Sequence, residues 1–165
     1  MKIFLIFLTL FFCSCTNFKP LYKKKEFISN NLKEIAVVTD KKKMSLSIKK
    51  NLIKKFPPIK DKINYILKIE SEIENTSTAT DTQRKTSGYE IKTTSKIYLF
   101  KRGKKYDREI LQFEENSIGL FNFSPNQVLS TLAARNRVLE NSSNDLSASI
   151  LYRLMIYFSN IDNDN

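Results

Sequence analysis

The chain has 165 residues, of which 41% are hydrophobic and 12% aromatic, with only three Gly and four Pro. This composition excludes a collagen-like or wholly disordered chain, and the length allows one modest domain with a single core. The absence of His excludes the usual His-based metal and catalytic sites. The formal net charge of +11 fits either affinity for a polyanion or genomic drift towards Lys at tolerant surface positions.

The first fourteen residues have the pattern of a lipoprotein signal peptide. After Lys2, residues 3–12 form an apolar run that is too short for a spanning helix, which needs about 20 residues. The tetrad Phe-Cys-Ser-Cys at 12–15 is similar to a lipobox, whose last cysteine accepts diacylglycerol. We therefore expect removal of residues 1–14 and a membrane tether through lipid on Cys15. The alternative is that Cys13 and Cys15 belong to an uncleaved anchor.

An extended linker is expected over residues 15–30, because Pro20 disfavours helix at the residue before it. A single domain is expected over residues 31–158, beginning with a short β-branched strand at 34–39. Asp40 can cap the helix that follows, and two prolines end that helix. Its apolar residues recur every four positions, with lysines on the other face: Met44, Ile48, Leu52 and Phe56.

Strict alternation of apolar and polar residues predicts the clearest strand, which begins at Ile63. The polar segment 75–87 has no apolar period and is expected to be a loop. A third strand alternates from Tyr89 onward, and a turn with Gly103 leads to a fourth strand that begins near Arg108.

The last element is predicted to be one long helix. Ser124 and Pro125 are a cap and a first helical proline. An apolar stripe then continues to Phe158, which gives a helix of about 34 residues and roughly 50 Å. The polar patch 141–145 could bend this helix, although we expect it to be continuous, and residues 159–165 are expected to be a flexible tail. The stripe consists of Val128, Leu132, Leu139, Leu146, Ile150 and Leu154.

The predicted order is therefore β, α, β, β, β, α. Four mostly antiparallel strands with two helices packed on one face make an α+β two-layer sandwich. The other face of the sheet is polar, so we expect it to face solvent or a partner.

The segment Phe18-Lys19-Pro20-Leu21-Tyr22 follows Cys15 after two residues. It is similar to the C-x-F-[RK]-P-L-Y start of the LptE family of lipopolysaccharide-assembly lipoproteins, particularly its alphaproteobacterial members, in which one residue separates the cysteine from the Phe. The resemblance continues through Arg84, through residues 121–124 and through the end of the last helix. The chain departs from the pattern in having Lys for most Arg and in three helix positions that are usually acidic or Ala: Asn136, Val138 and Ser142.

The resemblance implies a lipid-anchored protein of the outer membrane, with its domain in the periplasm or inside a barrel lumen. It implies a plug, in about a one-to-one complex, in the large β-barrel LptD, and help in inserting lipopolysaccharide into the outer leaflet. Thr16 rather than Asp after the cysteine also favours the outer membrane. The alternative is an accessory lipoprotein of another envelope lipid-transport system, such as an auxiliary subunit of an ABC transporter.

Two basic loops are candidates for binding the phosphates of lipopolysaccharide through charge-assisted hydrogen bonds. We prefer Arg84 and Lys85, because their loop is longer and more polar, over the second loop, which lies at the opposite end of the sheet. Ordinary solvated charge is the alternative. The second loop contains Lys101, Arg102, Lys104 and Lys105.

No enzyme activity, metal or cofactor is expected. The glutamates at 70, 72 and 74 share a strand face but have the pattern of ordinary exposed residues, and the sequence has no nucleophile elbow or Gly-rich loop. Nucleic-acid binding is suggested by charge alone and is contradicted by export. The many lysines around the first predicted helix are explained equally by drift, by contact with a barrel wall or by anionic lipid.

Overall fold

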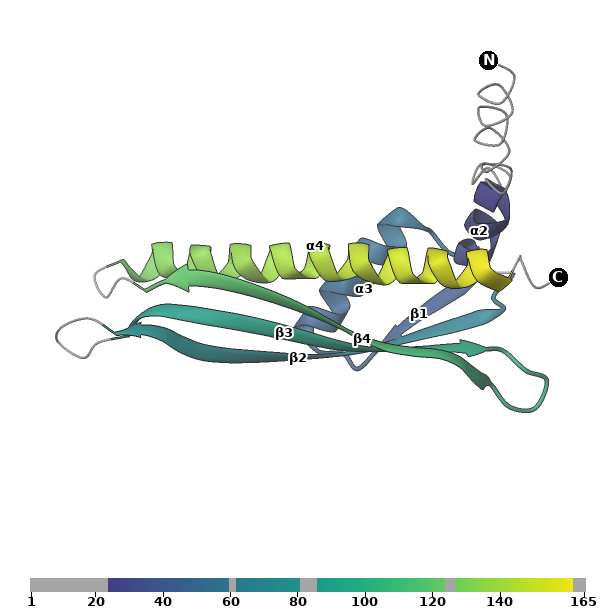
Figure 1. Cartoon of the computed structure of the whole chain (residues 1–165), viewed down its shortest axis with the longest axis horizontal. Helices are drawn as coiled ribbons and strands as arrows, with labels where there is room; N and C mark the ends of the chain where they lie inside the picture. The colour runs from purple at the N-terminus through teal and green to yellow at the C-terminus, as the bar shows by residue number, and fades with distance from the viewer. Residues whose placement is uncertain (1–23, 60–61, 81–85, 124–126, 162–165) are drawn as a thin grey trace, which may run out of the picture.

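The computed structural model describes residues 24–59, 62–80, 86–123 and 127–161. Seven elements follow one another in these ranges (Figure 1). After an additional first helix, their order is the β, α, β, β, β, α that the sequence predicts. In chain order they are α2 (Lys24–Lys33), β1 (Ile35–Thr39), α3 (Lys43–Lys55), β2 (Tyr65–Thr80), β3 (Thr86–Lys101), β4 (Arg108–Asn122) and α4 (Val128–Ile161).

Helix α2 corrects the prediction of an extended linker over residues 15–30, which is wrong from Lys24 onward. Its side chains Ile28 and Leu32 are buried, lie four positions apart and join the main core. Neighbours at this spacing share one face of a helix. Three apolar residues in a polar segment of ten give too weak a pattern to identify from sequence, and the helix is stabilised by docking against α4.

The sheet has the strand order β1-β2-β3-β4. Strand β1 pairs with β2 in parallel through the α3 crossover, whereas β2, β3 and β4 form an antiparallel meander. The prediction of a mostly antiparallel sheet of four strands is confirmed.

The loop predicted over residues 75–87 is wrong for most of its length, because β2 continues to Thr80 and β3 begins at Thr86. Asn75 pairs with Ile91 and Thr76 with Glu90. This segment is polar on both faces, so it has no hydrophobic alternation, but its threonines are β-branched and favour extended backbone.

All helices lie on one face of the sheet (Figure 1), and the two-layer α+β sandwich is confirmed. The core lies between the layers, where Leu67 and Ile69 of β2 and Ile97 of β3 meet Leu52 of α3 and Ile150 of α4. The aromatic residues near the ends of β4 and α4 also pack internally: Phe121 stacks on Tyr89 with ring centres 5.4 Å apart, and Phe158 lies edge-on to Tyr65 at 5.2 Å.

Helix α4 is continuous through its polar patch, as predicted, and continues to Ile161, so the tail prediction is wrong for residues 159–161. Within the patch, Ser143 is buried where α3 crosses. Its hydroxyl accepts a hydrogen bond from Asn51 Nδ2 at 3.0 Å and donates one to Ser47 at 2.8 Å. Small polar side chains let the two helices approach closely while their hydrogen bonds are satisfied.

The apolar stripe predicted for α4 is wrong at its start. Val128 and Leu132 are 58% and 51% exposed, whereas Thr131 is buried. Towards the end of the helix the buried positions recur every four residues, from Ser142 to Phe158. Four residues exceed one turn by about 40°, so the buried stripe winds around the helix and Val128 and Leu132 lie away from it.

At Gly119 of β4 the helix α4 approaches the sheet closely, because a methyl group in place of the glycine hydrogen would overlap with Cγ1 of Val138. Val138 is β-branched and has one preferred rotamer in a helix, so it cannot turn aside. We expect Gly119→Ala to lower the free energy of unfolding by about 1–3 kcal/mol, measured by urea denaturation. Adding Val138→Ala should recover most of this loss, whereas additive effects of the two changes would contradict the contact.

Candidate binding surfaces

The outer face of the sheet, away from the helices, is mainly polar, as predicted. Lys68 and Glu70 form an ion pair at 2.7 Å, and Thr94 donates a hydrogen bond to Asn116 at 2.7 Å. Three large apolar side chains are exposed among these polar groups: Val38 of β1, and Ile118 and Leu120 of β4. The face is therefore suited to an aqueous or mixed surface rather than to the interior of a bilayer.

Two predicted site regions lie outside the described residues. Cys15 precedes the described chain, and Arg84 and Lys85 fall between the end of β2 and the start of β3. The register places Thr80 and Thr86 at one end of the β2–β3 pair and Lys101 at the other end. The structure thus confirms that the two basic hairpins belong to opposite ends of the sheet.

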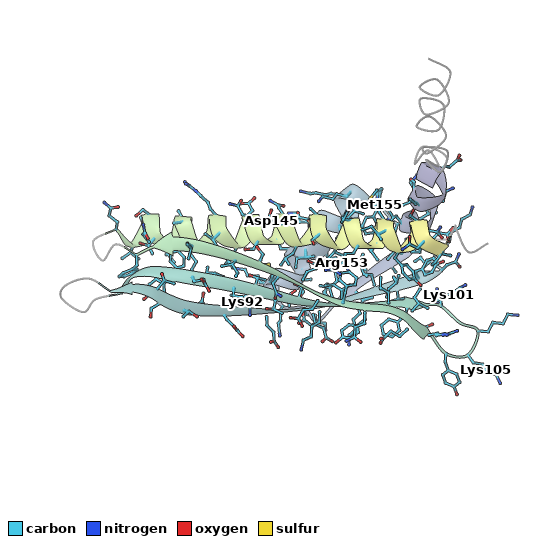
Figure 2. The ribbon with its side chains drawn as sticks, in the orientation of Figure 1. Lys92, Lys101, Lys105, Asp145, Arg153 and Met155 are labelled. Carbon is cyan, nitrogen blue, oxygen red and sulfur yellow. The ribbon has the colours of Figure 1, made fainter. Side chains whose placement is uncertain are left out.

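The basic hairpin between β3 and β4 is described, and its four predicted cations are all exposed. Figure 2 shows Lys101 and Lys105 at this end of the molecule, with Lys105 pointing outward. The turn is tight at Gly103, where any Cβ would collide with the carbonyl oxygen of Tyr106. Its backbone N–H donates a hydrogen bond to Asp107 Oδ1 at 3.3 Å. The hairpin presents positive charge to solvent.

A groove of about 480 Å³ lies between β4 and α4, which sequence reasoning did not identify. Its floor includes Phe113, and Glu115 accepts hydrogen bonds from Ser149 Oγ at 2.8 Å and from Arg153 Nε. The Arg153 guanidinium lies 5.4 Å from the Phe113 ring centre (Figure 2). The groove is mostly apolar because aliphatic and aromatic side chains line it, and Glu115 offsets the charge of Arg153. The sequence spacing of Phe113 and Glu115 indicates that they share one face of the strand. It does not predict the groove, because the other wall of the groove is formed only when α4 docks.

A second hollow lies beside the groove at the hairpin end, where Tyr65, Arg108 and Tyr157 line it. Burial raises the pKa of Tyr157 above its ordinary value, although the charge of Arg108 opposes this effect. The phenol therefore stays protonated at neutral pH and can donate a hydrogen bond.

The described residues contain no group of three or more acidic, Cys or His side chains that could hold a metal ion. None of the described helices is both long and apolar enough to cross a membrane.

No protein-family model matches the sequence, and no curated protein has a significantly similar sequence. Solved structures are similar in fold. A Caulobacter crescentus protein provisionally described as a lipoprotein has a TM-score of 0.64 at 11% identity, covering 81% of this chain and 97% of that chain. Rare lipoprotein B from Shewanella oneidensis has a TM-score of 0.61 at 14% identity, covering 78% and 98%. Lipoprotein B from Nitrosomonas europaea has a TM-score of 0.60 at 13% identity, covering 76% and 83%.

At these identities the comparisons establish the fold and nothing more specific. They cover nearly the whole length of two of the three solved chains, so the likeness includes the complete sandwich rather than a fragment. The α+β sandwich of this chain is the fold of these bacterial lipoproteins.

Proposed function

We propose that this chain is an outer-membrane lipoprotein of the LptE kind, which occupies the lumen of an LptD-like β-barrel and assists lipopolysaccharide assembly. The observation that carries the proposal is the fold shared with rare lipoprotein B over 98% of that chain. The lipobox-like tetrad ending at Cys15 and the Phe18–Tyr22 segment support it independently from the sequence.

The open edges of the sheet support enclosure by a partner. Strand β4 (Arg108–Asn122) forms one edge of the sheet and has no strand on its outer side among the described residues. On the other edge, β1 pairs with β2 only as far as Ile69, so the rest of β2 is also an open edge. Long unpaired edges promote aggregation, and proteins usually cover or charge them. A barrel that surrounds the sheet would cover both edges, and the polar outer face would suit its wet lumen.

The position of the anchor suggests which end enters the barrel. Helix α2, which is nearest in sequence to Cys15, lies at the same end as the β3–β4 hairpin (Figure 1). The opposite end has the start of α4, where Val128 and Leu129 are exposed. If lipid on Cys15 holds the first end at the periplasmic leaflet, the second end extends furthest into the lumen.

Co-purification tests the proposal. The full lipidated chain, affinity-tagged at its C-terminus, is isolated from outer membranes, and the expected result is recovery with a large β-barrel at about one to one. Leu129→Asp should lower this recovery, because it would bury a charge against the barrel wall. Tyr106→Asp changes an exposed apolar residue at the other end and serves as the control. Recovery with an inner-membrane permease instead would support the ABC-type alternative and reject the barrel.

The lipopolysaccharide contact is tested separately. Replacing both Arg84 and Lys85 with Ala is expected to weaken lipopolysaccharide affinity about tenfold, since one charge-assisted hydrogen bond contributes about 1.5–3 kcal/mol. Replacing both Lys104 and Lys105 with Ala removes equal charge from the opposite hairpin and should have a smaller effect. Equal loss in the two variants, measured by surface plasmon resonance, would indicate general charge attraction and not a site at the first loop.

A further inference from the structure

Basic charge is concentrated around α3 as well as in the β3–β4 hairpin. Residues 41–55 contain seven Lys and no acidic residue. The strands β2, β3 and β4 together contain five basic and seven acidic residues over three times that length. Drift towards Lys at tolerant positions would also enrich the exposed face of the sheet. The concentration around α3 therefore needs a local reason.

Helix α3 presents three of its five lysines on a single face. Its opposite face is buried against the sheet and α4 through Met44, Ile48 and Leu52. The exposed residues recur at helical spacing and define what we call the cationic face: Lys43, Leu46, Lys50 and Lys54. Leu46, 47% exposed, is an apolar side chain between lysines.

This arrangement is unfavourable for the isolated protein. Lysines precede and begin the helix, which has no acidic residue in its first turn, so they oppose the helix dipole. Lys50 and Lys54 are like charges one turn apart, which costs a few tenths of a kcal/mol. Lys41 just before the helix has a φ of 67°, a left-handed conformation that Lys rarely adopts.

Little within the described residues compensates for this charge. Of the lysines in 41–55, only Lys42 forms an ion pair there, with Asp40 at 3.6 Å. Lys55 donates a weak hydrogen bond to Ser147 at 3.5 Å. The described chain thus leaves the three lysines of the cationic face without anionic partners.

We propose that the cationic face of α3 binds an anionic lipid surface. Lysines beside such a surface each contribute about 1 kcal/mol, and their stems can extend along it while Leu46 enters the headgroup region. The face has no aromatic side chain on which a nucleic-acid base could stack. Anionic lipid therefore matches its chemistry better than nucleic acid.

The position of α3 is compatible with a bilayer near the tether. The segment that follows α3 contacts the end of α2, where the Ile59 N–H donates a hydrogen bond to the Lys33 carbonyl at 2.8 Å. Eight residues lie between Cys15 and the start of α2 at Lys24, and these nine steps along the chain limit the distance between them to about 30 Å. The inference depends on the proposed function only for this tether. Contact of the cationic face with lipid would add a second attachment to the membrane beside the acyl anchor.

The chain contains no Trp, so one introduced Trp reports a single position. The full lipidated chain with Leu46→Trp is reconstituted on phosphatidylcholine vesicles with or without phosphatidylglycerol. With phosphatidylglycerol, we expect the Trp emission to move to shorter wavelength and to be quenched by brominated lipid. Both effects should fall in high salt, because the attraction is screened. A Trp at Ile118, 61% exposed on the outer face of the sheet, is the matched control and should not respond.

The charge requirement is tested in the same Leu46→Trp chain by replacing Lys43, Lys50 and Lys54 with Gln, which should abolish the shift. These residues are exposed, so circular dichroism should show an unchanged fold. An unshifted Leu46→Trp spectrum, a shift equal on both kinds of vesicle, or a shift that survives the Gln changes would overturn the proposal. A shift only after addition of a barrel protein would identify a protein partner instead. The vesicles contain no barrel and no lipopolysaccharide, so failure here leaves the co-purification result independent.

Discussion

Replacing Cys15 with Ser is expected to move the protein from the membrane fraction to the soluble fraction. A serine hydroxyl does not accept diacylglycerol from the enzymes that modify a lipobox thiol, so the chain would have no acyl anchor. Each acyl chain contributes about 0.8 kcal/mol per buried CH₂, and several chains hold a protein firmly. Incorporation of radiolabelled palmitate followed by fractionation of membranes measures the loss.

Cys13→Ser is the matched control for this experiment. It changes the same residue type two positions earlier, keeps a small residue within the lipobox-like tetrad, and affects only the segment expected to be removed. Labelling and membrane association should be unchanged. Equal labelling of both variants, or none in the unaltered chain, would reject lipidation at Cys15.

Replacing Ile150 with Ala is expected to lower the free energy of unfolding by about 4 kcal/mol, within the range found for large-to-small changes in cores. Ile150 is 0% exposed and belongs to the cluster shared by the sheet, α3 and α4. Rigid strands and two crossing helices surround it, so the cavity cannot collapse easily. Domains of this size have about 5–15 kcal/mol of stability, so the variant would be close to unfolding.

Urea denaturation followed by circular dichroism measures the effect, and Ile156→Ala provides the comparison. Ile156 lies in the same helix but is 43% exposed, so its loss should cost less than about 1 kcal/mol. Equal midpoints for the two variants would show that α4 does not pack as described.

The alternating strands, the α3 pattern and the continuous last helix were predictable because their periodicity is strong over many residues. The alternation in the strands that begin at Tyr65 and near Tyr89 specifies which side faces the core, because a shift of one residue would turn the apolar side chains to solvent. The lengths of strands were not predictable where both faces are polar, as from Asn75 to Thr80, because no hydrophobic alternation marks them.

Helix α2 and the groove beside β4 illustrate what depends on contacts between distant segments. Ile28 and Leu32 acquire a partner only when α4 docks, and the Glu115–Arg153 pair joins a strand to a helix 38 positions away. Neither contact leaves a periodic signal in its own segment.

The sequence by itself predicted a leader that ends before Cys15, and it determined the two-layer class and the core face of α3 and of the alternating strands, because local pattern and composition are sufficient for these. Only the tertiary structure decided how far the strands extend, which end of α4 is buried, and that α3 presents its lysines without anionic partners among the described residues. The physical reason is that burial and charge pairing are properties of two surfaces in contact, and the second surface is specified by residues elsewhere in the chain.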